Sequence, residues 1–255
     1  MRAFRAACIL RADIHRDTLE AQQQSSSDSF VKRNLPYVRK ISAWPPTPEN
    51  VLEFRLVQDL FQGKKQVYQN RFIYEGRWRD SVVFVKFTRS YCPELHYFCA
   101  ERGHAPRLLG YGTVPGVWHV VVMEDLDEDP LMLSRARLHL TKWKEDLTKL
   151  VRDFHNEGLV HGDLRDANFT ISKNNPEQIK LFDFDWGGRV GEASFPTKLL
   201  NEELTGGKKL TSLKITKEHD NRVLLNTLDD FMKLRWCTVP ESEPGPMLKK
   251  PRKEY

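Results

Sequence analysis

The sequence has no hydrophobic run that is long enough to cross a membrane. Its best apolar run, "GVWHVVVM" at 116–123, is far shorter than the roughly 20 residues that a spanning helix needs. The amino-terminal segment 1–17 combines arginines with a brief apolar patch, but Asp13 and Asp17 interrupt it too early for a signal peptide. We therefore predict an intracellular, cytoplasmic protein with no membrane partner.

Cysteine is scarce as well, and its spacing argues against a CxxC pair and against a cysteine metal site. Cys8, Cys92, Cys99 and Cys237 form neither a CxxC pair nor a spaced metal-binding set. In a chain of 255 residues without a secretory signal, free buried thiols in a reducing compartment are the better interpretation.

A strong charge imbalance is also absent. The formal net charge of +5 is mild, and cationic residues are spread along the chain apart from one cluster near the carboxyl terminus. This distribution does not indicate a nucleic-acid partner. The cluster, "KKPRK" at 249–253, has two interpretations: a flexible basic tail, which we favour, and a nuclear address.

Length and composition favour one globular unit with extensions. The chain is 40% hydrophobic, which is enough for a sizeable core, and it shows no internal repeat. Residues 1–50 contain the polar low-complexity stretch "QQQSSSDS" and a proline-rich linker, so we predict a partly disordered N-terminal extension. Residues 51–236 are the predicted domain, and residues 237–255 are a flexible basic tail.

The first half of the domain has the pattern of an antiparallel sheet with one inserted helix. Turn signals separate five short runs rich in β-branched and aromatic residues, at 54–61, 66–76, 81–87, 107–114 and 118–126. Between the third and fourth runs, Ser90 is a candidate helix cap, Pro93 suits a first helical turn, and Gly103 ends the pattern.

The second half is mainly helical. In 141–158, apolar side chains recur at helical spacing and Gly158 closes the pattern. The runs 169–172 and 179–184 are typical of a small hairpin. The pattern over 217–236 predicts a late helix with one apolar face, formed by Leu224, Leu225, Leu228, Phe231 and Met232.

Polar side chains crowd into two stretches where the hydrophobic pattern predicts core, "LVHGDLRDANF" at 159–169 and "IKLFDFDWGG" at 179–188. Phosphoryl transfer from ATP needs phosphates to be positioned, magnesium to be held and a hydroxyl to be oriented. Magnesium prefers oxygen ligands, which Asn168 and Asp183 offer. Lys86 lies inside an apolar strand, so its ammonium must reach a cleft or an anion. Together these residues predict a site for magnesium and phosphate.

In their order along the chain, these motifs resemble those of the protein-kinase-like superfamily. "VFVKF" resembles the lysine strand, "VVMEDL" the hinge, "HGDLRDAN" the catalytic loop and "LFDFD" the magnesium-binding segment. The resemblance covers residues 51–236. It implies an α+β, two-lobed protein-kinase-like fold, with a small antiparallel-sheet N-lobe that contains one helix and a shortened, mainly helical C-lobe.

The resemblance implies an ATP site between the lobes. The residues that it assigns to ATP binding are Lys86, Glu94, Gly63, Val67, Glu124 and Leu126. Lys86 would pair with the phosphates, and Glu94, or Glu101 on the same predicted helix, would supply its counter-charge. The adenine would meet backbone groups of the hinge.

The resemblance also implies a catalytic and a metal-binding set. Asp163 would be the catalytic base, and Arg165 would lie near the transferred phosphate. Asn168 and Asp183 would hold magnesium, and Asp220 resembles the aspartate that braces the catalytic loop. The implied cofactors are ATP and Mg²⁺.

The sequence departs from the family pattern at three motifs. The loop that usually carries three glycines has only Gly63. Gly162 stands where protein kinases usually carry an arginine, a variation that is common in kinases of small molecules, such as aminoglycoside and choline kinases, and in compact atypical protein kinases. Asp185 stands where the magnesium-binding segment usually ends in glycine, and it is either a further metal ligand or a turn residue.

We predict an ATP-dependent kinase that acts as a monomer on Ser or Thr of a protein substrate. One alternative is a kinase of a small hydroxylated molecule, which the His161-Gly162-Asp163 sequence favours. Another is a pseudokinase that serves as a binding module, which the poor glycine loop favours. Small-molecule kinases often build their acceptor site from additional C-terminal helices, for which this chain has little room, so we favour a protein acceptor.

Overall fold

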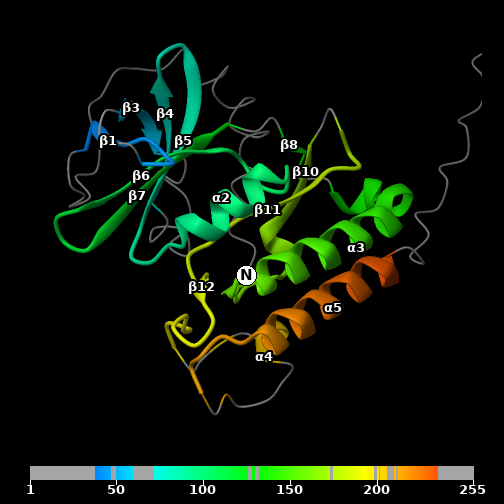
Figure 1. The fold of residues 1–255 in the computed structure, drawn as a ribbon. Coiled ribbons are helices and arrows are strands. Elements are labelled where there is room, and N and C mark those ends of the chain that lie inside the picture. The colour runs from blue at the N-terminus through cyan, green and yellow to red at the C-terminus, as the bar shows by residue number, and fades with distance from the viewer. Residues whose placement is uncertain are drawn as a thin grey trace, which may run out of the picture.

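The structure is a computed structural model. It describes residues 38–46, 50–59, 72–125, 128–129, 132–172, 175–197, 200, 202–205, 210 and 212–234. These residues form an N-lobe, which is an antiparallel sheet with one helix, and a mainly helical C-lobe with small sheets (Figure 1). Within this described part of the chain, no helix combines the length and the apolar character needed to span a membrane.

A five-stranded antiparallel sheet forms the N-lobe, in the order β3-β4-β5-β7-β6. Its strands are β3 (Arg55–Asp59), β4 (Phe72–Trp78), β5 (Ser81–Thr88), β6 (Leu108–Val114) and β7 (Trp118–Glu124). Successive side chains of a strand point to opposite faces, so Val83, Val85 and Phe87 of β5 pack into the N-lobe core. Phe84 and Lys86 lie on the other face, toward the C-lobe.

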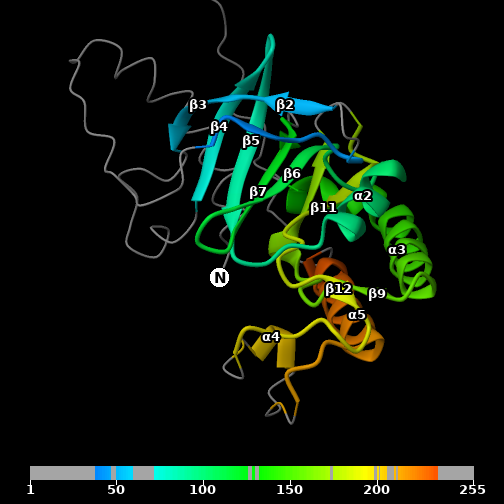
Figure 2. The same cartoon turned by 60° about the vertical axis from the view of Figure 1, so that its left-hand side comes forward.

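A short two-stranded ribbon completes the N-lobe. Strand β1 (Lys40–Ser42) pairs with β2 (Val51–Glu53) in antiparallel register. The ribbon lies beside β6 (Figure 2). Ala43 bridges to Gly110, and Ile41 is buried over that glycine. Residues 40–43, which the sequence pattern placed in the N-terminal extension, are ordered against the N-lobe sheet.

Helix α2 (Pro93–Glu101) follows β5 and packs between the lobes. Pro93 occupies its first turn, as predicted, where a proline loses no helical hydrogen bond. The predicted cap, Ser90, is wrong, because the residue that precedes the helix is Cys92, and its side chain makes no capping bond. Leu95 and Cys99 are fully buried.

The C-lobe is built on two long helices, α3 (Met132–Asn156) and α5 (Lys217–Leu234), which pack against each other (Figure 1). The predicted apolar stripe of α3 is buried along its whole length, and its members are Trp143, Leu147, Leu150, Val151 and Phe154. A single helical turn, α4 (Glu202–Thr205), contacts α5.

Short strands flank the loops of the C-lobe. Strand β10 (Phe169–Ser172) pairs with β11 (Ile179–Leu181), as the predicted hairpin, and with β8 (Glu128–Asp129). Strand β9 (Leu159–Val160) pairs with β12 (Gly188–Arg189). Two-residue strands carry no readable alternation, so the sequence did not predict this second pair. Because the polar stretches follow β9 and β11, the strands place the two stretches side by side.

The buried face of α5 is narrower than the sequence predicted. Leu224 is 3% exposed and Leu228 is 1% exposed, whereas Leu225 is 55% exposed. Neighbouring residues lie about 100° apart around a helix, so Leu225 points away from the face that Leu224 occupies. The side chain of Met232, also predicted for this face, lies outside the described residues.

Leu228→Ala should destabilise the protein much more than Leu225→Ala. Truncating a buried leucine costs about 2–5 kcal/mol of unfolding free energy, because packing contacts are lost and a cavity remains. Truncating an exposed leucine changes it by less than about 0.5 kcal/mol. Urea unfolding of both variants and the parent measures the two effects on one helix. Equal losses at the two positions would contradict the orientation of α5.

Candidate functional site

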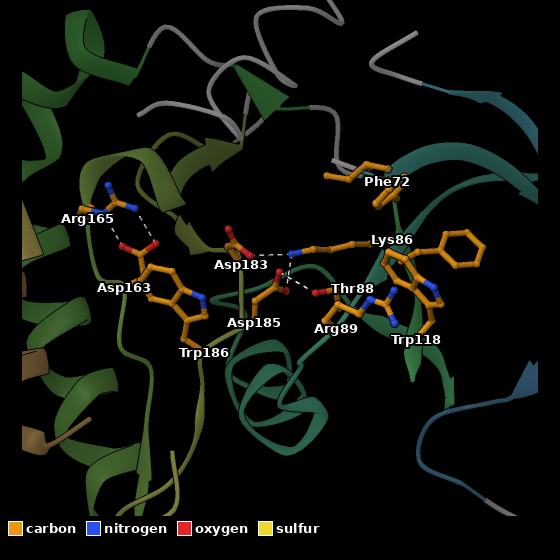
Figure 3. A pocket seen from close by; sticks show the side chains of 12 residues that line it. Phe72, Lys86, Thr88, Arg89, Trp118, Asp163, Arg165, Asp183, Asp185 and Trp186 are labelled. Carbon is orange, nitrogen blue, oxygen red and sulfur yellow. Dashed lines mark hydrogen bonds and ion pairs between the residues drawn. The ribbon is translucent and has the colours of Figure 1, made fainter. Parts of the chain in front are cut away.

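A cavity of about 320 Å³ lies between the lobes. The N-lobe lines it with Phe72, Lys86, Thr88, Arg89 and Trp118, and the C-lobe lines it with Asp163, Arg165, Asp183, Asp185 and Trp186 (Figure 3). Its volume falls at the lower end of the range for ligand pockets, about 300–1,000 Å³. Cationic groups of the N-lobe sheet and carboxylates of the C-lobe loops therefore meet in one place.

The Lys86 ammonium lies between two carboxylates. Its Nζ donates to Asp183 Oδ1 at 2.6 Å and to Asp185 Oδ1 at 2.5 Å (Figure 3). The side chain is only 6% exposed, and burial by itself would lower its pKa. The two carboxylates more than offset this effect, so the pKa of Lys86 is raised and the group stays charged.

The charges around Lys86 do not balance, because two carboxylates share one ammonium. Burial raises the pKa of Asp185, Lys86 opposes this effect, and the neighbouring carboxylate of Asp183 raises the pKa further. The pKa values of the Lys86 ammonium and of Asp185 are therefore both raised. A further positive charge nearby would stabilise the two carboxylates, Asp183 and Asp185, in their ionised form. A magnesium ion fits this requirement, since it prefers carboxylate and amide oxygens.

The described residues offer few protein ligands for such a cation. Among them, no three His, Cys, Asp or Glu side chains are grouped to hold a metal ion. Magnesium commonly uses only one or two protein side chains and shares its other positions with phosphate oxygens and water. Asn168 and Asp183 are the two side chains whose chemistry fits best.

Asn168 and Asp183 are held in place by a bond within the 161–168 loop and by a bond from that loop to the residue before Asp183. The Asn168 Nδ2 donates to the Asp163 carbonyl oxygen at 2.8 Å, which orients the amide. The Phe182 N–H donates to the Asn168 carbonyl oxygen at 2.8 Å, directly before Asp183. Asp183 itself has a φ of +64°, a left-handed conformation that is uncommon outside glycine and is enriched at functional sites.

Asp163 is paired within its own loop. Arg165 Nε donates to Asp163 Oδ1 at 2.5 Å, and Arg165 Nη2 donates to Oδ2 at 2.8 Å (Figure 3). This is a bidentate fork, the strongest geometry between these groups. Each oxygen of the Asp163 carboxylate therefore accepts a bond from Arg165.

Asp220 of α5 braces the loop that carries Asp163. Its carboxylate accepts the backbone N–H groups of His161 and Gly162, both at 2.7 Å. Gly162 has a φ of +84°, and a Cβ at this position would lie 2.6 Å from the Ile215 Cδ1 atom. The arginine that protein kinases carry here would therefore have neither the backbone conformation nor the space that it needs.

Stacked rings join helix α2 to the loop after β11, which contains Phe184. His96 stacks on Phe184 with ring centroids 4.6 Å apart, and His161 contacts Phe184 edge-on at 5.3 Å. His96 Nε2 donates to the Pro106 carbonyl oxygen at 2.8 Å, and Nδ1 accepts from the Tyr91 hydroxyl at 2.7 Å. A carbonyl oxygen only accepts, so these bonds define the neutral imidazole. Burial lowers the pKa of His96 to about 3.

The expected pair between Lys86 and Glu94 is not formed. Glu94 lies in the first turn of α2 and is exposed, and Glu101, the alternative partner, is exposed as well. Lys86 instead meets the carboxylates that follow β11. The physical reason is the orientation of α2, whose buried face presents apolar and aromatic side chains to the site.

The other residues expected to bind ATP do not line the cavity or cannot be placed. Glu124 ends β7, where its N–H donates to the Arg107 carbonyl oxygen at 3.0 Å and its Oε1 accepts the Arg107 N–H at 2.8 Å. Gly63, Val67 and Leu126 lie outside the described residues.

The site contains side chains that the sequence did not single out. Thr88 donates to Asp185 Oδ2 at 3.0 Å, and the signal was its position two residues after Lys86, on the same face of the strand. The Arg89 guanidinium lies 3.8 Å from the centroid of the Trp118 ring. No local signal predicts that contact, because only the pairing of β5 with β7 brings the two residues together.

A five-stranded sheet that supplies a lysine meets a helical lobe that supplies two aspartate-bearing loops, and the cavity lies between them. This arrangement is that of the protein-kinase-like fold. Solved structures with this fold confirm it. The Cydia pomonella granulovirus kinase PK-1 superposes with a TM-score of 0.51 and 13% identity, over 70% of this chain and 68% of that chain. Vaccinia related kinase 3 gives 0.52 and 12%, over 84% and 72%. The sequence matches no protein-family model and no curated protein.

Protein stability should fall as the pH drops below about 6.5, partly through His96. The pKa of His96 is about 3 in the folded protein and 6.5 in its ordinary state. Between these values the unfolded chain binds one more proton, so acidification costs up to about 1.4 kcal/mol per pH unit for this group. His96→Gln removes the titration, and urea unfolding from about pH 6.5 to 4.5 should show a shallower dependence. Equal slopes in variant and parent would rule out a neutral, buried His96.

Proposed function

We propose that the protein is an ATP- and magnesium-dependent phosphotransferase that acts on Ser or Thr hydroxyl groups of a protein. The observation that carries the proposal is that Lys86, Asp163 and Asp183, from three separate segments, line one cavity between the lobes. The likeness to solved kinase structures supports it at the level of the fold.

Each residue has surroundings that suit one role. Lys86 is charged and faces the cavity, so it contacts phosphate oxygens. Asn168 and Asp183 supply oxygens to magnesium, which when bound neutralises charge on the phosphates. Asp163 accepts the proton of the acceptor hydroxyl, while the hydroxyl oxygen bonds to the γ-phosphorus and the bond from that phosphorus to ADP breaks.

Arg165 connects nucleotide binding to the readiness of Asp163. The fork of Arg165 occupies both oxygens of Asp163. A γ-phosphate in the cavity offers the guanidinium a more highly charged partner of suitable shape. When Arg165 pairs with that phosphate, Asp163 is released to accept the proton.

A small hydroxylated acceptor is the second candidate. The observation that favours it is Gly162, since the His-Gly-Asp sequence resembles the catalytic loop of aminoglycoside and choline kinases. The catalytic residues would act in the same way on either acceptor.

Asp163→Asn and Asp183→Asn should have different effects. Asp163→Asn should lower turnover by about 10²–10⁴, because it removes the proton acceptor, and should leave nucleotide binding nearly intact. Asp183→Asn should lose the magnesium-dependent part of ATP binding. Thermal shifts with ATP, with and without a chelator, measure binding, and labelled ATP measures turnover. Exposed Asp229→Asn on α5 is the matched control.

Two outcomes would count against this assignment. A parent protein that millimolar ATP and magnesium do not stabilise would have no ATP site. A parent that binds ATP without turnover would be a pseudokinase.

Labelled ATP should transfer its γ-phosphate to protein substrates rather than to small hydroxylated molecules. The two acceptor classes are compared side by side with the parent, and Asp163→Asn serves as the blank. Label on the small molecules alone would replace the protein acceptor with the second candidate.

A further inference from the structure

The lysine of this kinase-like sheet has a partner other than the usual one. In protein kinases the anion beside that lysine is a glutamate on the helix that follows it. Here the acidic residues of that helix, Glu94 and Glu101, lie about two turns apart and so share one side, which is exposed. Turning this side toward Lys86 would carry the fully buried Leu95 and Cys99 into water.

Contacts with the loop after β11 hold α2 in this orientation. The Cys92 N–H donates to the Phe184 carbonyl oxygen at 3.1 Å, and His96 stacks on the Phe184 ring. Gly187 approaches so closely that a Cβ there would lie 2.9 Å from Leu95 Cδ2. These contacts leave α2 no room to rotate without separating from the loop.

Asp185 bonds both to Lys86 and to the strand that carries Lys86. Its Oδ1 accepts from Lys86 Nζ at 2.5 Å, and its Oδ2 accepts from Thr88 Oγ1 at 3.0 Å. Lys86 and Thr88 lie two residues apart on the same face of β5, so one carboxylate bonds to two neighbouring side chains of one strand. The Asp185 side chain is 23% exposed, against 11% for Asp183.

We propose that Asp185, rather than a glutamate of α2, is the positioning residue that holds Lys86 against the phosphates. The inference rests on the proposed function, because it assigns Lys86 to ATP. Asp183 and Asp185 then divide their tasks. Asp183 is available to magnesium when nucleotide binds, while Asp185 keeps a counter-charge beside an ammonium that is almost entirely buried.

This division predicts a site whose lysine does not depend on a carboxylate of α2. In the usual arrangement, moving the helix breaks the ion pair and switches the enzyme off. Here the carboxylate that binds the lysine and the carboxylate that binds the metal lie two residues apart in one loop. Lys86 and the metal ligand are therefore positioned together.

A double-mutant cycle on ATP affinity tests the role. Asp185→Asn should weaken ATP binding by about tenfold at a magnesium concentration that saturates the parent, the effect of one charge-assisted bond. Thr88→Val should weaken it less, because only the support of Asp185 is lost. In a Lys86→Met background, Asp185→Asn should cause no further loss. Fluorescent-nucleotide displacement measures all four proteins and the parent, with exposed Asp229→Asn as the matched control.

Two other variables separate this role from its rivals. If Asp185 were a magnesium ligand, its loss would be recovered at higher magnesium, and that recovery would overturn the proposal. Glu94→Gln, compared in parallel, should change ATP affinity by less than about twofold, as expected for an exposed side chain. A loss with Glu94→Gln equal to that with Asp185→Asn would return the role to α2.

Unfolding without nucleotide separates failure of this inference from failure of the ATP site. The same cycle of Lys86→Met and Asp185→Asn, measured in urea, should be non-additive, because a buried pair is removed only once. Additive effects would overturn the proposed pair whatever the protein binds. A parent that binds no ATP but shows this coupling would lose the proposed function and the phosphate role of Lys86, whereas the pair of Lys86 with Asp185 would stand.

Discussion

A buried ammonium needs an opposite charge close by, and in this protein the ion pairs that supply it connect the two lobes. Lys86 belongs to a strand of the N-lobe sheet, and its carboxylate partner Asp183 lies 97 residues later, in the C-lobe. Leaving such a group buried and unpaired costs several kcal/mol. The loop after β11 must therefore stay close to the sheet, and the cavity forms where they meet.

The loops around the cavity are supported from behind by groups that never enter it. Asp220 holds two backbone N–H groups of the loop that carries Asp163, and the Phe184 ring is held between α2 and His161. Such support limits the movement of the reacting groups, which is how a protein turns side chains into a site of defined geometry. Gly162 belongs to this support, because only a residue without a side chain fits between the loop and Ile215.

Much of the fold could be predicted because its elements carry local patterns. Alternation along 81–87, the helical stripe of 141–158 and the hairpin over 169–184 all depend on near neighbours in the chain. Predictions failed where a distant contact decided the outcome. Ser90 has the chemistry of a helix cap, yet α2 starts after Cys92. Leu225 has the chemistry of a core residue, yet the buried face of α5, which includes Leu224 and Leu228, is too narrow to cover it.

The candidate site shows the same division between what local sequence patterns predict and what distant contacts decide. By itself the sequence determined which chemical groups are present and on which elements they lie, because motif spacing and strand periodicity are local. Only the tertiary structure decided which carboxylate meets Lys86. Glu94 and Asp185 both carry a carboxylate, and the residues next to them in the sequence do not indicate which one faces Lys86. The burial of Leu95 and Cys99 turns Glu94 toward water, and the pairing of β10 with β11 brings Asp185 to the sheet. Burial and pairing of this kind are properties of the whole packed chain.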